Sequence, residues 1–64
     1  MGVLTEAVVS RIDSGQKFKA FSWLRDDGTF EAFWHEEGVR VTFFFQCNGK
    51  QMGMWKQYEL VVGG

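Results

Sequence analysis

Apolar and polar side chains alternate with a period of two along most of the chain, which is typical of half-buried strands. The clusters that interrupt the alternation combine Gly with Asp, Ser, Glu or Asn, residues that favour tight turns. No useful length of chain shows helical periodicity, and the sequence contains no Pro. We therefore expect five antiparallel strands, at about Leu4 to Ile12, Lys17 to Leu24, Thr29 to His35, Val39 to Gln46 and Met52 to Val62.

The hairpin from Gln16 to His35 carries aromatic residues on both faces, around a strong Asp27-Gly28 turn signal. Strict alternation predicts that Phe21 and Trp23 face the core together with Phe30, Ala32 and Trp34. The opposite face would then hold Phe18, Phe33 and His35. Together with the next strand, this register predicts a set of core residues comprising Trp23, Trp34, Phe43 and Phe45.

A chain of 64 residues has room for one core, so residues 1–64 are expected to form a single domain. Five short antiparallel strands avoid exposed edges by curling into a small barrel. The fold expected is an all-β, five-stranded antiparallel barrel of the oligonucleotide-binding (OB) type. An SH3-like barrel is the alternative, because the number of strands does not separate the two.

Composition limits the possible functions. A net charge of −1 and a pI near 5.7 argue against gripping duplex DNA, which needs a basic face. One Cys and one His exclude an internal disulfide and make a structural zinc site implausible, and no catalytic motif surrounds the Ser residues or His35. We expect no enzyme, cofactor or metal. Since no apolar run could cross a bilayer, we expect a cytoplasmic protein without a membrane partner.

Several segments resemble the cold-shock domain, a five-stranded barrel that binds single-stranded RNA and DNA. The segments QKFKAF and AFWH occupy the places of the family's K-G-F-G-F-I and V-F-V-H motifs. Around them, VVSRID is similar to the family's first strand, DDG to its central turn and EGVRVTF to its E-G-x-x-V-x-F segment. The resemblance covers most of the chain, from about Ala7 to Phe45.

The resemblance implies that Phe18, Phe33 and His35 stack on unpaired bases. Arg11 stands where the family has a stacking Trp, and Lys17 flanks the platform in place of a family glycine. Ala20 replaces a second stacking Phe, and the turn Glu36-Glu37-Gly38 replaces a much longer binding loop. The function expected is therefore binding of single-stranded RNA or DNA on a reduced platform.

The alternative function is a small protein-interaction or homodimerisation module without a nucleic-acid role. It would use the same aromatic face, or Phe44, which falls on the polar register of its strand. The acidic pI and the missing stacking residues favour this alternative.

Overall fold

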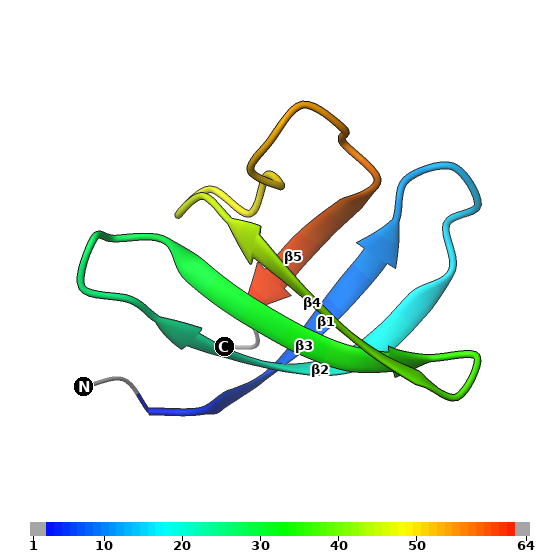
Figure 1. The fold of residues 1–64 in the computed structure, drawn as a ribbon, viewed down its shortest axis with the longest axis horizontal. Coiled ribbons are helices and arrows are strands. Elements are labelled where there is room, and N and C mark those ends of the chain that lie inside the picture. The colour runs from blue at the N-terminus through cyan, green and yellow to red at the C-terminus, as the bar shows by residue number, and fades with distance from the viewer. Residues whose placement is uncertain (1–2, 63–64) are drawn as a thin grey trace.

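The computed structural model describes residues 3–62, with only the backbone of Val62, and confirms five antiparallel strands (Figure 1). They are β1 (Thr5–Arg11), β2 (Lys17–Leu24), β3 (Phe30–Glu36), β4 (Val39–Phe45) and β5 (Tyr58–Val62). The last strand is shorter than expected, because residues 52–57 form a loop in which Gly53 has a φ of +102°. Residues 3–62 include no helix of the length and apolarity needed to span a membrane.

The strands form one sheet in the order β4-β3-β2-β1-β5. Figure 1 shows β1 and β5 crossing β3 and β4 at a steep angle, with the bent β2 passing from beside β1 to beside β3, so the sheet curls into a half-barrel. This shape is compatible with a small OB-fold-like barrel. The connectivity follows the SH3-like alternative, since each strand pairs with its neighbour in sequence and β5 returns to β1, whereas a Greek key would set β4 beside β1.

The segment after β4 joins the two edges of the sheet at one end. Gln51 bridges to Phe45 of β4, and Lys50 bridges to Glu59 of β5. The Leu60 N–H donates to the Gly49 carbonyl over 2.9 Å. A Cβ on Gly49 would lie 2.4 Å from the Leu60 carbonyl oxygen, so only glycine fits this contact.

The inner face of the curled sheet holds the core, which is built around Trp34. The Trp34 side chain is 2% exposed, and its ring centroid lies 5.0 Å from that of Tyr58 and 5.7 Å from that of Phe43. Phe45 is fully buried and Phe43 is half-buried against the cluster. The predicted core positions Trp34, Phe43 and Phe45 are therefore confirmed as inward-facing.

The hairpin of β2 and β3 has a different register from the predicted one. Asp26, Asp27 and Gly28 form a three-residue loop, closed by a 2.7 Å hydrogen bond from the Arg25 N–H to the Thr29 carbonyl. Gly28 has a φ of +87°, as three-residue hairpin loops require at their last position.

This register turns Phe21 and Trp23 away from the core. Phe21 lies opposite Phe33, and Trp23 lies opposite Glu31, all on the outer face. A shift of one residue moves every side chain of a strand to the other face. The prediction that Phe21 and Trp23 belong to the core is therefore wrong, and Phe18, Ala20 and Ser22 take the inner face instead.

Candidate functional site

A groove opens on the outer face where β2 and β3 separate. Their ladder ends at the pair Phe21 and Phe33, so the preceding residues of β2 are not paired with β3. The groove encloses about 480 Å³. Four aromatic rings and four basic or imidazole side chains line this aromatic groove: Lys17, Phe18, Lys19, Phe21, Phe33, Trp34, His35 and Arg40.

The structure brings four of the five predicted site residues to this groove, although not on one face. Phe33, His35 and Lys17 belong to the outer face. Phe18 belongs to the inner face, where its ring stacks on Trp34 with centroids 6.3 Å apart. The prediction of one shared face is therefore wrong because of the altered register, and Phe18 reaches the groove only where the strands part.

Arg11 does not line the groove. Its Nη1 donates to Glu36 Oε2 over 2.7 Å and its Nε pairs with Asp13 over 3.2 Å. Glu36 Oε1 also accepts hydrogen bonds from the Tyr58 hydroxyl, over 2.9 Å, and from the Trp34 indole, over 3.3 Å. The predicted stacking position is thus part of a polar cluster that links β1, β3 and β5.

The same cluster shifts two pKa values. The negative charge of Asp13, followed by that of Glu36, raises the pKa of Arg11 above its ordinary value. Burial, followed by the hydrogen bond to Glu36, raises the pKa of Tyr58 above 10.0. Arg11 therefore stays charged beside its two carboxylate partners. Its ion pair with the largely buried Glu36 occupies the guanidinium.

Four residues of the groove were not predicted as site residues: Lys19, Phe21, Trp34 and Arg40. Phe21 is 48% exposed, and its ring centroid lies 6.1 Å from that of Phe33. The Arg40 guanidinium lies over the Phe33 ring, 4.7 Å from its centroid. A sequence signal exists for Arg40, because the two-residue turn of Glu37 and Gly38, both with positive φ, places it opposite His35.

Charge is distributed unevenly around the groove. Lys17, Lys19 and Arg40 line it together with His35, and no Asp or Glu does. The chain as a whole has 8 acidic residues against 7 basic ones. The groove is therefore locally basic on an acidic protein, which the total charge conceals.

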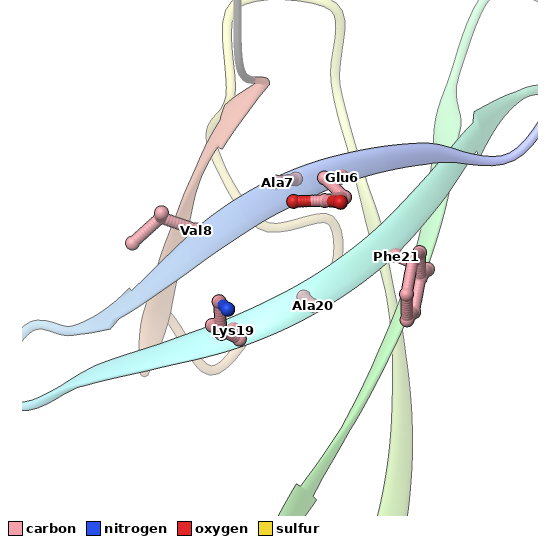
Figure 2. A pocket seen from close by; sticks show the side chains of 6 residues that line it. All are labelled: Glu6, Ala7, Val8, Lys19, Ala20 and Phe21. Atoms are coloured by element: carbon pink, nitrogen blue, oxygen red, sulfur yellow. The ribbon is translucent and has the colours of Figure 1, made fainter.

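A second, smaller hollow adjoins the groove between β1 and β2 and encloses about 280 Å³. Figure 2 shows Glu6 and Val8 of β1 and Lys19 and Phe21 of β2 around it. Its floor is the pair of Ala7 and Ala20, whose side chains are buried on the inner side. Since Lys19 and Phe21 also line the aromatic groove, the two depressions share a wall.

Comparisons with protein-family models, with curated proteins and with solved structures found no match for the chain. The resemblance to the cold-shock domain therefore depends on the motifs alone. Within residues 3–62, no three His, Cys, Asp or Glu side chains are grouped so that they could hold a metal ion. The candidate site is thus defined by its rings and its positive charge.

Proposed function

We propose that the protein binds single-stranded RNA or DNA in the aromatic groove. One observation carries this proposal: the groove combines four aromatic rings with Lys17, Lys19 and Arg40, and no carboxylate of residues 3–62 lines it. Proteins that bind single strands combine stacking rings with a positively charged path for the backbone. The acidic pI does not argue against such a site, because the charge that matters is local.

The exposed surfaces suggest how a strand would be held. Phe21 offers a ring face to one base, since nearly half of its side chain is exposed. The guanidinium plane of Arg40, supported from below by Phe33, offers a second stacking surface. Lys17 and Lys19 are exposed at the rim and would pair with phosphates. Such a site holds only a few nucleotides.

Stacking predicts that the rings, more than any single charge, determine affinity. We expect Phe21→Ala and Phe33→Ala each to weaken binding of short oligouridylate or oligothymidylate by about 1–3 kcal/mol. The measurement is fluorescence anisotropy of a labelled oligonucleotide, with circular dichroism to show that each variant is folded.

Phe44→Ala is the matched control for this experiment. Phe44 is 40% exposed on the outer face of β4 and has Arg25 over its ring at 4.7 Å, but it does not line the groove. Its removal should leave affinity unchanged. Wild-type protein that binds no oligonucleotide up to millimolar concentration would refute the proposal, as would equal losses from Phe44→Ala and Phe21→Ala.

A protein-interaction module remains the second candidate, and a different surface favours it. Met54 and Trp55, in the loop between β4 and β5, are 88% and 76% exposed. Large neighbouring apolar side chains on a soluble surface mark contact sites. This alternative would show as a mass that rises with protein concentration in sedimentation, falls with Trp55→Ala and does not respond to oligonucleotide.

A further inference from the structure

The small hollow beside the aromatic groove contains a carboxylate that has no partner among the described residues. Glu6 is exposed, and it makes no hydrogen bond or ion pair with any other described residue. It lies directly across from Phe21 in the ladder of β1 and β2. An ionised carboxylate accepts hydrogen bonds and donates none. Glu6 is therefore suited to a ligand that presents N–H donors.

The position of this carboxylate relates it to the groove. Phe21 and Lys19 form the wall between the two depressions, and Figure 2 shows both side chains beside Glu6. A strand that stacks a base on Phe21 and places a phosphate near Lys19 therefore passes next to Glu6. No side chain fills the floor of the hollow, because the small side chains of Ala7 and Ala20 are turned to the inner face of the sheet.

We propose that the small hollow is a base-reading subsite in which Glu6 selects guanine. This inference rests on the proposed function of the aromatic groove. Guanine is the base whose Watson–Crick edge presents two adjacent donors, N1–H and the N2 amino group, and a carboxylate accepts both. Cytosine and adenine each present one donor next to an acceptor. That acceptor would face the second carboxylate oxygen and be repelled by it. Uracil places its only donor between two acceptors.

Charge-assisted, two-point hydrogen bonds of this kind discriminate strongly between bases. Phe21 would hold the base and Lys19 the adjoining phosphate, so that Glu6 supplies selectivity and the groove supplies most of the affinity. The carboxylate repels phosphates, yet Lys19 stands on the same hollow and offsets that repulsion.

The test compares three short oligouridylates that differ at one central base: uridine, guanosine or inosine, which lacks the N2 amino group. Wild-type protein should bind the guanosine strand about tenfold more tightly than the all-uridine strand. The inosine strand should fall between them. In Glu6→Gln the guanosine-over-uridine ratio should drop to near one, because the uncharged amide offers a single acceptor.

Glu59→Gln is the control, since Glu59 is an exposed carboxylate on the neighbouring strand β5 and lines neither depression of the site. It should keep the guanosine preference. Wild-type protein that binds all three strands equally, or a Glu6→Gln variant that keeps the preference, would overturn the inference while leaving the proposed function intact. If no strand binds, the proposed function fails and the inference fails with it.

Discussion

At the centre of β2, the hydroxyl oxygen of Ser22 is buried without a hydrogen-bond partner among the described residues. Ser22 is fully buried and lies opposite Ala32 on the inner face, next to the aromatic core. A buried hydroxyl without a partner costs about 1–3 kcal/mol of stability. A small polar residue at this position therefore weakens the core instead of strengthening it.

Replacing Ser22 by Ala should accordingly stabilise the protein. The substitution removes only the unpaired oxygen, and we expect the free energy of unfolding to rise by about 1 kcal/mol, the low end of the range because a small void remains. Urea denaturation measures this change, with Ser10→Ala, a half-exposed site on β1, as the control. A loss of stability in Ser22→Ala would mean that the hydroxyl has a partner in solution.

Two loops of the chain are stabilised in the same way, by a side-chain oxygen that accepts a hydrogen bond from the N–H two residues later. In the loop from Arg25 to Thr29, the Asp27 carboxylate accepts from the Thr29 N–H over 3.0 Å and from its hydroxyl over 2.6 Å, which lowers the pKa of Asp27 below 3.8. Asn48 accepts in the same way from the Lys50 N–H over 3.0 Å. Each loop contains a glycine with a similar positive φ, Gly28 at +87° and Gly49 at +89°.

These two glycines separate backbone strain from close packing. Alanine at either position should lose about 1–2 kcal/mol, because L residues resist a positive φ. Gly49→Ala should lose at least about 1 kcal/mol more, since its Cβ would meet the Leu60 carbonyl at 2.4 Å and disturb the hydrogen bond to Leu60, whereas nothing lies within 4 Å of a Cβ at Gly28. Thermal or urea unfolding of both variants measures the difference, and equal losses would contradict the close contact.

The sequence predicted the limits of the strands well but the facing of β2 wrongly, and the loop after β2 explains why. Strand limits follow from alternation and from turn residues, so β1 to β4 lie within about a residue of expectation. The facing of β2 against β3 depends on whether the Asp-Asp-Gly loop has two residues or three, and both lengths use Gly. The burial of aromatic rings could not decide between the two loop lengths. The hairpin carries rings on both faces, so either register buries some of them.

For the whole molecule, the distribution of charge matters more than its sum. The chain has a net charge of −1, yet three cations line a groove without acids. Residue types along the chain predicted Phe33, His35 and Lys17 as site residues, and the structure brings them to this groove. Sequence could not reveal that Arg11 is held by Glu36, because that ion pair joins residues 25 positions apart across the barrel.

The local positive charge predicts a measurable salt dependence of binding. If Lys17, Lys19 and Arg40 each contact a phosphate, the logarithm of the binding constant should fall with the logarithm of salt concentration with a slope of about −2. Lys19→Ala should reduce the slope by about 0.7. Lys50→Ala, outside the groove, should leave it unchanged. A slope near zero in the wild type would mean that no phosphate is contacted.

Because aromatic rings occupy both faces of β2 and β3, a collapsed chain can bury rings with the hairpin aligned either way. Hydrophobic attraction then drives chain compaction without selecting the native alignment, and the selection passes to the Asp27 and Gly28 loop. A misaligned hairpin would have to separate its strands before it could refold. The folding speed of this domain is therefore expected to depend on the rate at which a loop of three residues closes correctly.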